Sequence, residues 1–194
     1  MPPLRGWAYR SQGPVLGCPH LPIAIANDLE MFRMTNKAKA AALFVRADTS
    51  EDNGDLHLAF RLMLAAAKLG DRGAQVNVGN YYDDGKVVRR NRTAALYWYK
   101  RAYHRGDACA AHNIGVLWRN EQKPRRALEW FFRAVKLGDD GANLEIAKHF
   151  LDNERNPKKA IPHLERVVKS KWVSEADSEE AAELLAKAIK VQRR

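Results

Sequence analysis

The chain has 194 residues, of which 46% are apolar and 29% are charged, and its formal net charge is +10. These values are typical of one soluble globular domain and exclude a collagen, a disulfide-rich scaffold and a wholly disordered chain. Two cysteines, Cys18 and Cys109, are too few for a disulfide framework and favour a reducing compartment. No stretch approaches the roughly 18 consecutive apolar residues of a membrane helix. We therefore expect a cytoplasmic protein without a membrane span.

Prolines set the beginning of the chain apart from the rest. Residues 1–35 hold five of the eight prolines and show no sustained hydrophobic period. We expect this segment to be a loosely ordered N-terminal tail, followed by a helical repeat domain over 36–194.

A repeat with steps of 36, 32 and 33 residues relates four alanines, which are Ala59, Ala95, Ala127 and Ala160. Eleven residues after each of the first three stands a Gly-Asp pair, beginning at Gly70, Gly106 and Gly138. Glycine can end one helix in the left-handed conformation, and aspartate can cap the next. Nine residues after each glycine stands Gly79, Gly115 or Ala147. Small residues at fixed positions let helices cross closely, so the repeat predicts packed helix pairs.

In chain order, the helical spacing of apolar residues predicts a helix over 36–47, an acidic loop, and a helix over 56–69. Helix pairs are expected at 73–84 with 92–105, 109–120 with 124–137, and 141–152 with 157–169. A last helix over 175–191 would cap the array. The predicted fold is all-α: a right-handed αα superhelix, or solenoid, of stacked helix pairs.

One block carries a more specific pattern. Residues 74–106 read AQVNVGNYYDDGKVVRRNRTAALYWYKRAYHRG. This block resembles the Sel-one-like repeat family, a branch of the tetratricopeptide-like superfamily, with Val78 where that family has leucine. The resemblance extends over 59–151. It implies an adaptor role in bacterial signalling or assembly, and a concave surface lined by the first helix of each pair.

Residues for catalysis or metal binding do not form a recognisable set. The sequence lacks H-E-x-x-H, G-x-S-x-G and the glycine-rich phosphate loops. Cys109 and His112 have a spacing that could hold a metal, but no further Cys/His pair completes a site. We expect no enzymatic activity, no cofactor and no metal.

The helix register places a set of polar and apolar side chains on the expected concave surface. A row of amides there could bind the backbone of an extended peptide, or it could tie neighbouring helices together. Arginine and lysine beside it would attract acidic side chains or a C-terminal carboxylate. The candidate partner-binding residues are Asn77, Asn80, His112, Asn113, Val116, Arg119 and Lys148, with Val76, Leu144, Glu145 and Asp152 also facing inward.

A second candidate surface is a basic flank without acids. Its members are Lys86, Arg89, Arg90, Arg92, Lys100, Arg101 and Arg105. Residues 119–126 add Arg119, Lys123, Arg125 and Arg126. Such a flank is either a solvated outer face or a site for acidic proteins or nucleic acid.

Two function hypotheses follow. The first is a non-catalytic scaffold that holds a protein or peptide in its concave groove. The alternative is a solenoid that binds nucleic acid or an acidic partner through the basic flank. Either could act as a monomer or a homodimer.

Overall fold

The computed structural model describes residues 35–192. The expected N-terminal tail over 1–35 lies outside the described residues, apart from Thr35. The described residues form one compact unit.

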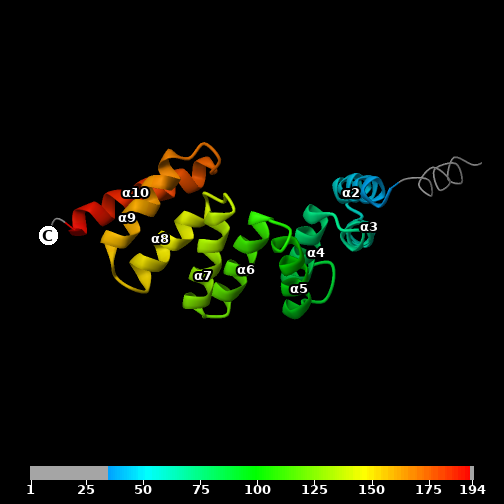
Figure 1. Cartoon of the computed structure of the whole chain (residues 1–194), viewed down its shortest axis with the longest axis horizontal. Helices are drawn as coiled ribbons and strands as arrows, with labels where there is room; N and C mark the ends of the chain where they lie inside the picture. Colours follow the sequence, from blue (N-terminus) through cyan, green and yellow to red (C-terminus); the bar gives the residue numbers. More distant parts are fainter. Residues whose placement is uncertain (1–34, 193–194) are drawn as a thin grey trace, which may run out of the picture. The chain divides into compact units, whose positions relative to one another are not determined.

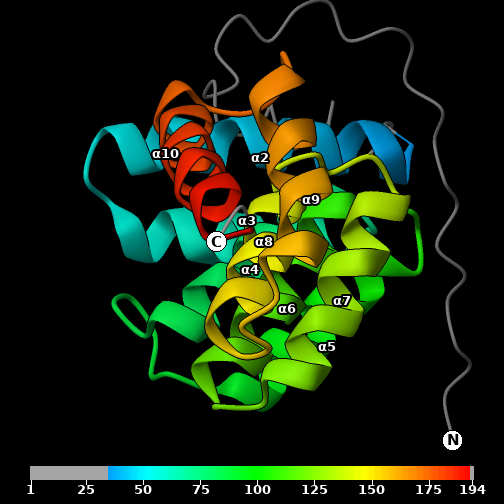
Figure 2. The ribbon, with the colours of Figure 1, turned by 90° about the vertical axis from the view of Figure 1, so that its left-hand side faces the viewer.

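All regular structure within residues 35–192 is helical. The helices are α2 (Asn36–Asp52), α3 (Leu56–Lys68), α4 (Arg72–Asp84), α5 (Arg92–Tyr103), α6 (Ala108–Asn120), α7 (Pro124–Lys136), α8 (Ala142–Asp152), α9 (Pro157–Lys169) and α10 (Glu175–Gln192). Each helix packs chiefly against its neighbours in sequence, so α4 to α9 stack as three successive pairs (Figure 1). The end-on view shows the pairs layered behind one another (Figure 2). This confirms the predicted all-α solenoid.

The first helix is longer than predicted. We expected it to end at Ala47 and to be followed by an acidic loop, but α2 continues to Asp52. The hydroxyls of Thr49 and Ser50 donate to the carbonyls of Val45 and Arg46, one turn earlier, at 3.0 and 2.8 Å. These bonds keep polar residues inside the last turn of the helix. The expected acidic loop is therefore reduced to residues 53–55.

Glycine ends a helix at each Gly-Asp turn as predicted, whereas the aspartate is the N-cap of α4 and of α6 but not of α8, whose N-cap is Gly141. Gly70, Gly106 and Gly138 have φ angles of 98°, 82° and 99°, in the left-handed region that a side chain would strain. The aspartate that follows each glycine accepts a hydrogen bond from a backbone N–H in the first turn of the next helix. The distances are 2.8 Å for Asp71 to Ala74, 2.9 Å for Asp107 to Ala110, and 3.2 Å for Asp139 to Ala142.

Close helix crossings occur where the repeat carries a small residue. A Cβ atom added to Gly79 would lie 2.3 Å from the ring of Tyr99, and one added to Gly115 would lie 2.6 Å from the ring of Phe131. The ring at each glycine therefore belongs to the second helix of the same pair. In the third pair the equivalent residues are Ala147 and Leu164, both fully buried.

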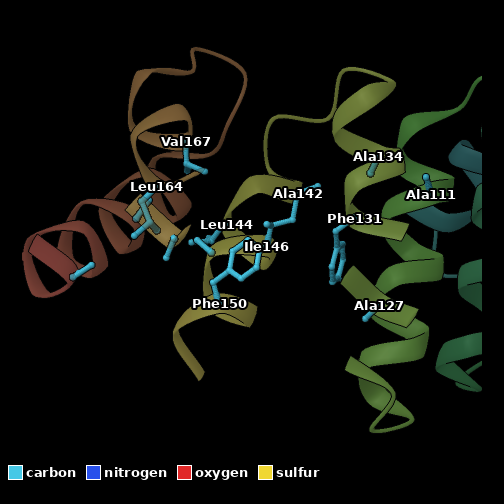
Figure 3. Close-up of a cluster of buried hydrophobic side chains, with 14 residues drawn as sticks. Ala111, Ala127, Phe131, Ala134, Ala142, Leu144, Ile146, Phe150, Leu164 and Val167 are labelled. Carbon is cyan, nitrogen blue, oxygen red and sulfur yellow. The ribbon is translucent and has the colours of Figure 1, made fainter. Parts of the chain in front are cut away.

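The third pair thus has alanine in place of glycine on its first helix, and leucine in place of a ring on its second helix. Its core includes Ile146, Phe150 and Leu164, and Phe131 of α7 belongs to the same buried cluster (Figure 3). Because interiors are close-packed, the volume gained on one helix has to be given up on the facing helix. The residues at these two repeat positions therefore vary together, because their side chains are in contact.

This complementarity predicts the outcome of a paired substitution. Gly115→Ala should lower the free energy of unfolding by roughly 1–3 kcal/mol, because overpacking against Phe131 outweighs the helix propensity that alanine adds. Adding Phe131→Leu should restore part of that loss by recreating the alanine–leucine pair of α8 and α9. Urea unfolding of both variants and of Phe131→Leu alone measures the coupling. Simple additivity of the two single effects would contradict the proposed packing.

Candidate functional site

The candidate partner-binding residues lie along the first helices of the three pairs. Asn77 and Asn80 are on α4, His112 to Arg119 are on α6, and Lys148 is on α8. Each of these candidates keeps some solvent exposure. Two further residues expected to face inward do not: Val76 is 9% exposed and Leu144 is 4% exposed. They pack into the core, where neighbouring helices cover them.

Asparagines on this surface link neighbouring helix pairs. Asn80 Oδ1 accepts hydrogen bonds from Tyr99 Oη at 2.8 Å and from Asn113 Nδ2 at 3.0 Å. Burial, together with Asp83 and Asp84 nearby, raises the pKa of Tyr99 above its ordinary value, so its hydroxyl stays protonated and donates. The amide row thus ties α4, α5 and α6 together. That the remaining amide atoms of this row bind a peptide backbone stays a prediction.

His112 makes an equivalent link to the next unit. Its Nδ1 lies 2.7 Å from Oδ2 of Asp139, whose Oδ1 accepts a hydrogen bond from the backbone N–H of Ala142. Burial acts to raise the pKa of Asp139, but the hydrogen bonds from His112 and from the backbone N–H groups of Ala142 and Gly141 more than offset it. The pKa of Asp139 therefore lies below its usual value.

The two cations of the set are also paired. Arg119 of α6 bonds to Glu145 of α8, and Lys148 of α8 lies 2.8 Å from Glu180 of α10. Together with the Asn80–Asn113 bond, these pairs connect α4, α6, α8 and α10 in a row of polar contacts, which we call the polar ladder. Its charged members are partly exposed, so an incoming acidic or basic group can compete for them.

A hollow of 260 Å³ opens beside this ladder, where α6, the start of α7 and α8 meet. Ala127 and Phe131, each 2% exposed, lie at its apolar base. Its charged lining residues are Arg119, Glu145, Lys148 and Asp152, and the ring of His149 also lines it. We call it the ladder pocket. At 260 Å³ it is smaller than the roughly 300–1,000 Å³ of small-molecule sites, so it suits one side chain of a protein partner.

Sequence reasoning found most of the ladder pocket but not its base. Arg119, Glu145, Lys148 and Asp152 were placed on the inner surface by register, and they do line the pocket. Phe131, which lies at the base, was not among the residues predicted for this surface. Its column, four residues after each repeat alanine, holds Met63, Tyr99, Phe131 and Leu164, and the two rings in it could have signalled a side chain facing the preceding helix.

The basic flank divides into two groups in the structure. Lys86 to Arg92 lie on the α4–α5 loop and at the start of α5, whereas Lys100, Arg101 and Arg105 lie at the other end of that helix. Arg101 covers the rings of Tyr97 and Trp98, and Arg105 donates to the carbonyl of Gly70. The predicted single flank is therefore not one surface, because a helix of this length separates its ends.

Within the described residues, no group of three His, Cys, Asp or Glu side chains could hold a metal ion. Burial, with Asp107 and Asp139 nearby, raises the pKa of the Cys109 thiol, which disfavours the reactive thiolate. No helix in this part of the chain is long and apolar enough to cross a bilayer.

Comparison with known proteins now adds to this geometry. The sequence model of the Sel1 repeat matches residues 52–71, 73–107, 110–139 and 171–190, together more than half of the chain. The chain belongs to the Sel1 repeat family. Proteins of this family are generally protein-interaction scaffolds and typically non-catalytic. The family model passes over the α8–α9 pair, which follows the turn at Gly138 and has alanine and leucine where the two preceding pairs have glycine and a ring.

Two solved structures share the fold. A Sel1 repeat protein from Oxalobacter formigenes is 21% identical with a TM-score of 0.63, and the match covers 85% of this chain and 70% of that one. A protective antigen of uropathogenic Escherichia coli strains with an SLR fold is 20% identical with a TM-score of 0.60. That match covers 77% of this chain and 38% of the antigen. A search of curated protein sequences returns no match.

The lowered pKa of Asp139 predicts an acid-dependent loss of stability. A carboxylate with a depressed folded pKa stabilises the protein above its unfolded pKa, and that stabilisation is lost as the pH falls through the folded value. Asp139→Asn keeps an acceptor for the N–H of Ala142 but loses the charged bond to His112, so it should cost roughly 1–2 kcal/mol at neutral pH. The two proteins should converge below the ordinary carboxyl pKa of 3.8.

Urea unfolding across this pH range measures the difference. Asp107→Asn is the matched control, because Asp107 accepts from the N–H of Ala110 as Asp139 accepts from that of Ala142, but has no histidine partner among the described residues. A constant gap between wild type and Asp139→Asn down to strong acid would refute the role given to the charge.

Proposed function

We propose that this chain is a non-catalytic scaffold that holds a segment of a partner protein along the polar ladder, with one side chain of the partner in the ladder pocket. The observation that carries the proposal is the pocket itself, where an apolar base that includes residues of α7 is surrounded by charged side chains of α6 and α8. A small apolar centre inside a polar rim is the usual anatomy of a protein interface.

The paired charges of the rim support a protein ligand. Arg119 and Glu145 already neutralise each other, and so do Lys148 and Glu180. A neutral rim gives little long-range attraction, so affinity would come from the buried side chain and from hydrogen bonds to the partner backbone. Binding to this surface should therefore change little with salt.

The remaining parts of the proposal concern context. We place the scaffold in the cytoplasm, which the two cysteines of the chain support. Its activity needs no cofactor in this proposal, since its role is to bind. It acts as a monomer or a homodimer.

Filling the ladder pocket tests the proposal. Asp152 lies at the exposed end of α8, lines the pocket and has no ion pair among the described residues. Asp152→Trp should occupy the space without breaking the polar ladder. Affinity capture from native lysate should then recover a partner with wild type, at low and high salt, and lose roughly ten times or more of it with the variant, as expected when a central anchor is blocked.

Glu129→Trp is the matched control, because Glu129 is exposed on α7 and lies outside the lining of the pocket. It adds the same ring and removes one carboxylate. Equal recovery of the partner by Asp152→Trp and by wild type would rule out the ladder pocket as the anchor site.

A further inference from the structure

Two loops that are far apart in the sequence meet on the same side of the stack (Figure 1). They are the α4–α5 loop and the α6–α7 loop. Glu121 joins them, because its carboxylate lies 3.6 Å from Arg92 Nη1 and 2.8 Å from Lys123 Nζ. Hydrogen bonding to Lys123 is the main cause that lowers the pKa of Glu121, and Arg92 and Arg126 act in the same direction.

The meeting of these loops gathers cations from two repeats. All of them are exposed, and we call this surface the basic edge. It consists of Lys86, Arg89, Arg90, Arg92, Lys123, Arg125 and Arg126. The carboxylates within or beside it are Asp83, Asp84 and Glu121, of which Asp83 lies 3.4 Å from Arg90. Positive charge is therefore in clear excess, and among the described residues Arg89 and Arg125 enter no ion pair.

The basic edge is open to solvent and carries two shallow hollows. One of 590 Å³ is lined by residues 89–93, and a second of 410 Å³ is lined by residues 123–126. Each hollow has at least three cationic side chains in its wall. Clustered charges of one sign raise the local concentration of an oppositely charged ligand.

The placement of these cations is unfavourable for the isolated fold. Arg92 is the first residue of α5, and Arg125 and Arg126 lie in the first turn of α7. Neither of these first turns contains an acidic residue. The helix dipole favours anions at this end and disfavours cations. Cations that oppose the dipole and repel one another cost stability, and an anionic partner would offset that cost.

The rings near the edge argue against nucleic acid as the partner. Lys123 Nζ and Arg126 Cζ lie 5.0 and 5.1 Å from the centre of the Trp118 ring. Arg101 lies over Tyr97, 5.8 Å from the centre of that ring, and donates to its hydroxyl. Single-stranded nucleic acid binds where bases stack on open aromatic faces, and here cations already occupy them.

We propose that the basic edge binds an acidic segment of a partner protein, with its carboxylates held by the arginines of the two hollows. Five of the seven cations are arginine, whose planar fork matches a carboxylate in a bidentate bond. This surface is separate in composition from the polar ladder: it is strongly charged, whereas the ladder is neutral. The two surfaces would recognise different features of a partner.

Fluorescence anisotropy with a labelled peptide of alternating glutamate and glycine tests the proposal on the full chain. Arg89→Gln with Arg125→Gln should weaken binding roughly fivefold for each arginine removed, the upper range for exposed charge contacts. Raising the salt from about 50 to about 200 mM should weaken binding to wild type. The control is Lys136→Gln with Lys171→Gln, which removes the same charge at exposed positions away from the basic edge.

The control variant should bind the peptide as wild type does. Equal weakening in both double variants would show that net charge alone attracts the peptide, and it would overturn the proposal. An oligothymidylate of the same charge is the second probe. Tighter binding of this probe than of the peptide, with the same dependence on Arg89 and Arg125, would reassign the basic edge to nucleic acid. Failure here is read from peptide binding to the Arg89 and Arg125 variant, whereas failure of the ladder pocket is read from capture of the partner by Asp152→Trp, so the two failures are distinct.

Discussion

The two helices of a pair are held together where a glycine on the first helix leaves room for an aromatic ring of the second. Gly79 and Gly115 leave room for Tyr99 and Phe131, so the two helices of each pair approach closely. Other features depend on that approach. The buried cluster shared by α7, α8 and α9 requires it, and so does the base of the ladder pocket, where Phe131 lies between its glycine and the hollow. In the third pair, alanine and leucine meet the same constraint with the volumes exchanged.

The polar surface of the first helices follows from this packing. Once the pairs stack at a fixed separation, the side chains of Asn80, His112 and Arg119 come within reach of groups on adjacent elements. Their bonds are exposed or half-buried, so each contributes modestly to stability. Their combined effect is to hold the orientation of neighbouring pairs and to keep the ladder pocket open between α6 and α8. A scaffold that binds without rearranging loses less entropy on association.

Two surfaces of opposite character thus occur on the same stack. The ladder pocket is neutral and has an apolar base, whereas the basic edge is charged and open. Apolar anchors set affinity, while unpaired charges set the rate of encounter and the choice of partner. A solenoid can carry both because the first helices of its pairs line the inner surface, while loops between helices form the edge.

The sequence by itself determined the repeat register, the helix pairs and the Gly-Asp turns, because these depend on local backbone preference and on spacing along the chain. Gly70, Gly106 and Gly138 could be assigned from that spacing alone. The end of α2 could not, since the helix continues beyond the point where its apolar pattern stops, with the hydroxyls of Thr49 and Ser50 bonded to carbonyls one turn earlier. Tertiary structure alone decided which charges pair. Arg119 meets Glu145, and Arg92 meets Glu121, only because adjacent helices stack in one relative rotation. The helical period determines on which face of a helix a side chain lies. The helix that packs beside that face determines which residue the side chain contacts.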